Sequence, residues 1–203
     1  MKRMMAVFAV LTALAPVASA AEVSRFKANG ASADLYFEQN GVYTSLSVYQ
    51  GDQNQSYLSY YQSQCAYTDV SFTCSGKNLY GALSNRDFSL QGKNKATLST
   101  NGSGLSGTSF TYTCTYDTYD CNFQETPISG GTFQVTWNKS SEYSSHNTGT
   151  SQSEYFNFRY RSSGSYSSTS AKASGNVLGV SLSNVSGSIG VSKSRSITIE
   201  KLN

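Results

Sequence analysis

Four cysteines are the residues whose type and spacing point most clearly to a chemistry: Cys65, Cys74, Cys114 and Cys121. In an exported protein such a set predicts two disulfides, which could be paired in three ways. A metal site is the alternative, but no two cysteines have Cys-x-x-Cys spacing and the chain contains one histidine. We therefore expect structural disulfides and no metal or other cofactor.

Catalytic patterns are scarce. His146 lies in a Ser-, Asn- and Gly-rich stretch that reads as a loop, and Glu142 is four residues away. A serine hydrolase needs a histidine held by a buried carboxylate, and nothing in the sequence marks such a partner. Nucleophile-elbow, P-loop and metalloprotease motifs are absent. We expect a protein that is not an enzyme.

The acidic residues are compatible with two further functional hypotheses, a glycosidase site and a cation site. Paired carboxylates could form a glycosidase site, which sequence spacing alone does not exclude. Asp117 and Asp120, in the segment between Cys114 and Cys121, are the one local acidic pair. They could hold a cation weakly. Aspartates also favour turns, and we prefer the interpretation that both residues belong to a solvated turn.

The N-terminus has the features of a cleavable secretory signal peptide. Lys2 and Arg3 precede an apolar stretch over 4–15, and Ala18-Ser19-Ala20 fits the small-x-small cleavage pattern. The apolar stretch is shorter than the ~20 residues that cross a bilayer. We expect residues 1–20 to be removed, and 21–203 to form a secreted or periplasmic protein without an integral membrane segment. The signal resembles bacterial ones.

The composition is neutral, hydroxyl-rich and aromatic-rich. Charged residues make up 13%, and the chain contains 15 Tyr and 10 Phe. The net charge of +3 includes Lys2 and Arg3, so cleavage leaves a nearly neutral protein. Near neutrality argues against nucleic acid or an anionic membrane as the partner.

Alternation of apolar and polar residues with a period of two is the main structural signal. It is clearest over 110–115, 133–138, 155–161 and 197–200, each of which predicts a strand with one face toward a core. Turn signals separate these segments, and no stretch after the signal has a sustained helical period. The fold class is therefore all-β, an antiparallel β-sandwich or a barrel-like pair of sheets.

An internal repeat organises the mature chain. Residues 75–85 align with 174–184 at an offset of 99, with six of eleven positions identical. Apolar positions outside this core match at the same offset, which a shared core face would require. We interpret the chain as one domain of two duplicated units, 31–100 and 130–199, with an inserted hairpin over 101–129, and the alternative is that each unit forms its own small sandwich. In that hairpin, 108–116 would pair with 121–128.

The repeat also selects a disulfide pairing. Cys65 aligns with Gly164 and Cys74 with Ala173, so both cysteines are present in one unit and both absent from the other. Mutual partners would behave in this way. We therefore expect Cys65–Cys74, and Cys114–Cys121 follows by elimination.

The tyrosines are the remaining candidates for binding. Tyr57 and Tyr61 recur as aromatic positions in the second unit, so we expect them in the core. Tyr60 aligns with Arg159 and is the better candidate for an exposed ring. The candidate binding residues are Tyr60, Asp117, Tyr119 and Asp120.

These observations favour an exported, non-enzymatic β-protein that binds a glycan or a protein outside the cell membrane. A polysaccharide hydrolase with two carboxylates is one alternative. A secreted inhibitor, with the segment 115–120 as its wedge, is the other.

Overall fold

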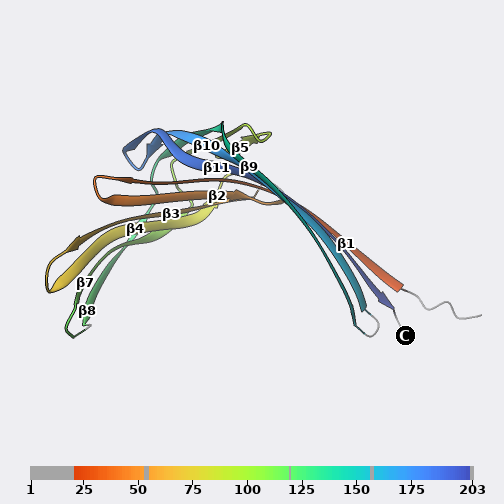
Figure 1. Ribbon diagram of the computed structural model, residues 1–203, viewed down its shortest axis with the longest axis horizontal. Coiled ribbons are helices and arrows are strands. Elements are labelled where there is room, and N and C mark those ends of the chain that lie inside the picture. The colour runs from red at the N-terminus through yellow and green to blue at the C-terminus, as the bar shows by residue number, and fades with distance from the viewer. Residues whose placement is uncertain (1–20, 53–54, 119, 156–157, 202–203) are drawn as a thin grey trace, which may run out of the picture.

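The computed structural model describes residues 21–52, 55–118, 120–155 and 158–201. The strands of this part of the chain form a single antiparallel sheet. Its strand order is β5-β6-β9-β10-β11-β1-β2-β3-β4-β7-β8 (Figure 1). The described part of the chain contains no helix able to cross a lipid bilayer. The strands are β1 (Ala21–Gln39), β2 (Val42–Gln50), β3 (Ser56–Tyr67), β4 (Ser71–Leu83), β5 (Phe88–Gln91), β6 (Lys95–Thr100), β7 (Leu105–Thr115), β8 (Cys121–Ser129), β9 (Phe133–Tyr155), β10 (Phe158–Val177) and β11 (Val180–Lys201).

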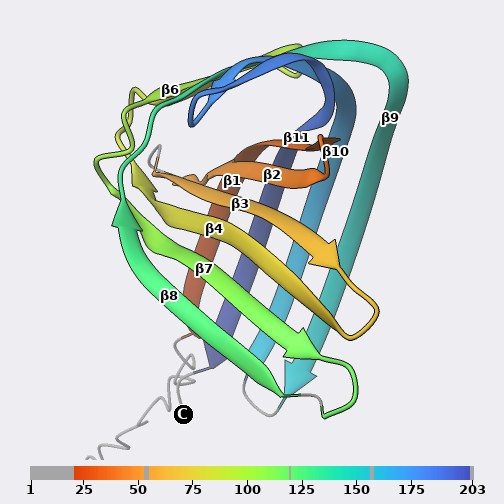
Figure 2. The ribbon, with the colours of Figure 1, turned by 90° about the vertical axis from the view of Figure 1, so that its left-hand side faces the viewer.

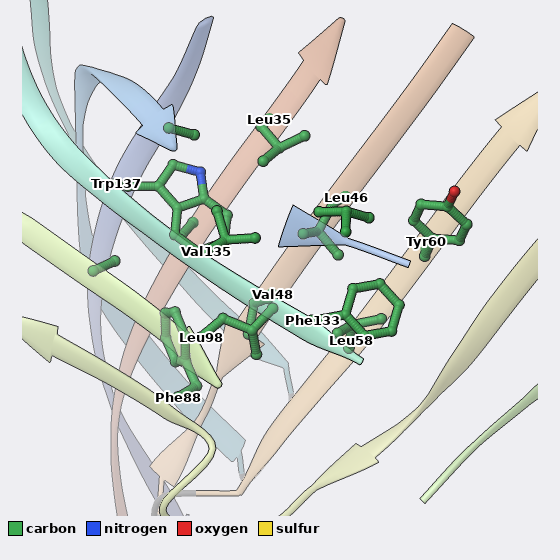
Figure 3. Close-up of a cluster of buried hydrophobic side chains, with 14 of the residues drawn as sticks. Leu35, Leu46, Val48, Leu58, Tyr60, Phe88, Leu98, Phe133, Val135 and Trp137 are labelled. Atoms are coloured by element: carbon green, nitrogen blue, oxygen red, sulfur yellow. The ribbon is translucent and has the colours of Figure 1, made fainter. Parts of the chain in front are cut away.

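The sheet folds over so that two of its regions pack face to face and enclose the core. Phe133 and Trp137, from the start of β9, are completely buried against β1, β2 and β3 (Figure 3). The ring of Phe133 meets that of Tyr60 edge to face, with centroids 5.6 Å apart. Burying rings of this size supplies a large share of the hydrophobic stabilisation.

The ends of four strands leave this core as a ribbon that we call the arm, made of residues 21–30, 144–155, 158–168 and 192–201 (Figure 2). The β9–β10 pairing shifts register between Thr169 and Ala171, and such irregularities bend strands. The core lies on one side of the shift and the arm on the other. Most side chains of the arm are exposed on both of its faces.

Several expectations from the sequence are confirmed. The protein is all-β and antiparallel, and Phe133, Val135 and Trp137 face the core as their alternation predicted. The expected hairpin within 101–129 is formed by β7 and β8. The predicted signal peptide, residues 1–20, lies outside the described residues.

The expected sandwich of separate sheets is replaced by one continuous sheet whose regions pack on each other. The tandem duplication stays a prediction from the sequence. In the first unit β3 and β4 are joined by a turn over 68–70, whereas the aligned residues 167–169 lie within the strand β10.

Not every alternating segment faces a core. Ile197 and Phe158 belong to the arm, where their side chains are 42% and 39% exposed. Alternation shows that a strand has two chemically different faces, but it does not show that either face is covered.

Candidate binding surface

The register of the strands assigns each side chain to one of two sides of the sheet. Leu46, Leu58 and Tyr60 are buried on the side that faces the core. Side chains alternate along each strand, so Tyr43, Tyr61 and their neighbours at odd positions lie on the opposite, outer side. Pairing carries this outer side across β4, β7 and β8.

Eight aromatic rings gather on this outer side in a connected group, which we call the aromatic face. Tyr61 stacks on Phe110 and Phe110 on Tyr112, with centroids 6.0 and 6.3 Å apart and planes within 24° of parallel. Phe72 then joins Tyr112 to further rings. The members are Tyr43, Tyr61, Tyr67, Phe72, Phe110, Tyr112, Tyr116 and Phe123.

The rings form a second, thin apolar layer. Phe110, Cys74 and Cys114 are buried on this outer side and are not part of the main hydrophobic cluster. Gly76 leaves room for the layer, because a Cβ at that position would lie 2.7 Å from Cζ of Phe110 and would collide with the Gln62 carbonyl oxygen. The aromatic face is therefore packed against the backbone on one side and open on the other.

Both predicted disulfides are present and lie on this outer side, beside the rings. Cys65 pairs with Cys74 and Cys114 with Cys121, each across two neighbouring strands with Cα atoms 4.1 Å apart. Such bridges fix the register of the hairpins that carry the rings. Two disulfides are typical of a protein that folds in an oxidising compartment.

Charged side chains are almost absent from the outer side here. Among the outer positions of β2, β3, β4, β7 and β8, Glu125 is the single charged residue. Between the rings lie hydroxyl and amide groups from Ser45, Ser59, Ser63 and Asn78. An exposed apolar surface with interspersed hydrogen-bonding groups is a candidate interaction site.

The structure reverses the sequence-based assignment of three tyrosines. Tyr60 is 1% exposed and belongs to the core, so the prediction of an exposed ring is wrong. Tyr57 and Tyr61, predicted in the core, are 51% and 39% exposed. The repeat alignment misled here, whereas the alternation with Leu58 places Tyr60 on the core side.

The buried hydroxyl of Tyr60 has no hydrogen-bond partner in the described structure. Burial favours the neutral phenol over the phenolate and raises the pKa of Tyr60 to about 12. This side chain supports the core and is removed from the candidate binding residues.

The segment around Asp117 and Asp120 is the turn between β7 and β8. The Thr115 amide donates to the Asp120 carbonyl oxygen at 3.0 Å, and the Thr115 and Thr118 hydroxyls are 2.6 Å apart. Asp117 and Asp120 are both exposed, as expected of turn residues. Tyr119 lies outside the described residues. The turn follows Tyr116 directly and borders the aromatic face.

His146 lies in the long strand β9, not in the loop expected from its neighbours. Its Nδ1 is 2.7 Å from the Ser167 hydroxyl. Ser167 is 7% exposed in the middle of a paired strand, where a substrate carbonyl has no access. The pair links the neighbouring strands β9 and β10.

Burial and hydrogen bonds shift the pKa values of two carboxylates, Asp34 and Asp87. Burial raises the pKa of Asp34, against the opposing effect of hydrogen bonds with serines that include Ser47 and Ser188. Burial also acts to raise the pKa of Asp87, but hydrogen bonds from Ser84 and Thr100 outweigh it and lower the pKa. Within the described residues, no three His, Cys, Asp or Glu side chains gather as metal ligands.

Sequence reasoning found the cysteines but missed the aromatic face, whose rings come from five segments of the chain. The usable signal was the shared parity of Tyr57, Tyr61, Cys65 and Tyr67 along one strand. No protein-family model matches this chain, and no curated protein or solved structure is significantly similar to it.

Proposed function

We propose that this is an exported, non-enzymatic binding protein whose aromatic face holds an uncharged glycan. The observation that carries the proposal is the row of stacked rings in which the buried Phe110 supports Tyr61, which is 39% exposed, and the half-buried Tyr112. The C–H faces of sugars are apolar and pack on such rings, while their hydroxyls bond to the polar groups between them.

Charge favours a glycan over a protein as the ligand. Complementary charges contribute specificity and speed of association to protein–protein interfaces. The outer side of β2, β3, β4, β7 and β8 offers one carboxylate, Glu125, and no Lys or Arg, and on β1 Glu38 lies opposite Tyr43. A neutral polymer rich in hydroxyls needs no charged contact, and serine, asparagine and tyrosine supply the hydrogen bonds.

Rigidity also supports binding at this face. The two disulfides pin β3 to β4 and β7 to β8, on the same side of the sheet as the rings. A ligand then meets aromatic rings that are already in place, so little conformational entropy is lost on binding. Export, the remaining element of the proposal, agrees with the disulfides and with the predicted signal peptide.

The test is retention of the folded protein, residues 21–203, on neutral polysaccharides and on an array of neutral glycans. Tyr61→Ala and Tyr112→Ala should each weaken binding about tenfold, since one stacked ring contributes on the order of 1–2 kcal/mol. Tyr166→Ala is the matched control, because Tyr166 is an exposed tyrosine of the arm. Absence of binding to any neutral glycan, or equal losses in all three variants, would refute the proposal.

A further inference from the structure

The arm carries a concentration of positive charge on its core-side face. Ala33 and Ile189 are paired and buried, which identifies the odd positions of β1 and β11 as the core side. The same register continues into the arm without a shift, and β10 follows it. The core-side positions of the arm include six basic residues, which we call the basic face: Arg25, Lys27, Arg159, Arg161, Lys193 and Arg195.

These six residues are all exposed and are poorly balanced by acids. They are six of the fifteen Lys and Arg residues in the whole chain. Glu154 is the one carboxylate at the core-side positions of the arm, and it bonds Arg159 at 2.8 Å. The near-zero charge of the mature chain thus conceals a local excess of positive charge.

Shallow grooves run across this face. One has a volume of about 680 Å³ and is lined by Gln152, Arg161, Arg195 and Ile197 among others. The next has a volume of about 300 Å³, with Lys193 and Ser165 in its lining. Arg195 and Thr150 line both, so the two grooves adjoin along the arm.

We propose that the basic face binds an acidic polysaccharide, one that carries carboxylate, sulfate or phosphate groups. Arginine forms paired hydrogen bonds with such groups, and lysine attracts them as a point charge. The grooves also present threonine, glutamine and serine side chains, which suit the hydroxyls of a sugar backbone. This site differs from the aromatic face in its strands, its side of the sheet and its charge.

A nucleic acid fits the basic face less well. Proteins that bind single strands combine basic residues with aromatic side chains on which bases stack. The core-side positions of the arm hold no aromatic residue at 23–29, 148–154, 159–165 or 193–199. The large apolar side chains present there are Val23, Ile197 and Ile199.

The experiment uses the folded protein, residues 21–203, with four probes: heparin, polygalacturonate, single-stranded DNA and vesicles containing anionic lipid. We expect binding to at least one acidic polysaccharide, with an affinity that falls as salt rises. Arg161→Gln combined with Arg195→Gln should weaken that binding at least tenfold. The matched control is Arg86→Gln with Lys93→Gln, which removes the same charge from exposed positions elsewhere.

Three results would overturn the inference. Equal losses in the two double variants would show that net charge alone matters. Tighter binding to DNA, or binding to vesicles alone, would assign the face to another class of partner. Retention on neutral glycans should not change in Arg161→Gln with Arg195→Gln, so this experiment and that on Tyr61 can fail separately.

Discussion

The indole Nε1 of Trp137 donates a hydrogen bond to the backbone carbonyl oxygen of Asp34, 103 residues away, at 3.0 Å. This bond joins β9 to β1 across the fold of the sheet, and the indole is completely buried. Gly187 makes room for it, because a Cβ there would lie 3.1 Å from Cδ1 of Trp137 and collide with the Asp34 oxygen. At this point the folded sheet brings β9 and β1 into close contact across the core.

Gly187→Ala should therefore destabilise the protein by about 1–3 kcal/mol, the range for overpacking a core. Gly149→Ala is the control, since a Cβ at that position would meet nothing within 4 Å, and it should change stability by less than about 0.5 kcal/mol. Urea unfolding followed by the fluorescence of Trp137, the one tryptophan of the chain, measures both. Equal midpoints would contradict the proposed role of Gly187.

Tyr60→Phe should leave the protein as stable as the wild type or more stable by about 1 kcal/mol. The buried hydroxyl has no hydrogen-bond partner in the described structure, so its removal ends a desolvation cost. Denaturant unfolding at neutral pH checks this. A loss of more than about 1 kcal/mol would indicate that the hydroxyl is bonded.

The same residue predicts an alkaline pH dependence. The pKa of Tyr60 is about 12 in the folded protein against 10.0 for the free side chain. Between these values the unfolded chain has lost the proton and the folded protein retains it, so stability falls as pH rises. The loss reaches roughly 2–3 kcal/mol near pH 12. Tyr60→Phe should lack this contribution, which a comparison of unfolding curves from pH 9 to 12 would detect.

The contribution of Asp87 to stability should have the opposite pH dependence, in the acidic range. Its pKa is lowered in the folded protein, because hydrogen bonds from Ser84 and Thr100 outweigh burial. The stability it contributes is present above the unfolded pKa of about 4 and is lost as pH falls through the folded pKa. Asp87→Asn should weaken the protein at pH 7 by about 1–2 kcal/mol and flatten the acid limb of the stability curve. Unchanged unfolding at both pH 7 and pH 3 would exclude this role.

The sequence predicted the strands, the core-facing residues and the disulfide partners, which can be inferred without knowing how the strands pair. Alternation identified the strands and the core-facing Phe133, Val135 and Trp137, and joint absence from the repeat identified Cys65 and Cys74 as partners. These features follow from spacing along one segment or from the alignment of two segments. They do not require knowledge of which strands become neighbours.

The two candidate sites depend on that knowledge and were not predictable in the same way. Tyr61, Phe110 and Phe72 come from separate strands and become one surface through pairing alone. Arg25 and Arg195 are 170 residues apart in sequence and approach only because β1 pairs with β11. Net charge sums over the chain, so it hides charges that pairing segregates to one face.

The final prediction concerns the support of the aromatic face. Gly76→Ala would place a methyl group against the ring of Phe110 and the Gln62 carbonyl oxygen, and should displace the middle ring of the stacked row. Phe110→Leu removes the same ring without straining the backbone. Both variants should reduce retention on neutral glycans at least tenfold while binding to acidic polysaccharide is preserved.

Gly164→Ala is the control for this pair, because a Cβ there would lie at an ordinary 3.5 Å from the nearest neighbour, the Lys193 carbonyl oxygen. Trp137 fluorescence reports whether each variant is folded. If Gly76→Ala unfolds the protein, Phe110→Leu still tests the row, since truncating a ring to leucine usually costs less than the stability of a disulfide-linked domain. Wild-type retention by a folded Phe110→Leu protein would show that the stacked row does not hold the glycan.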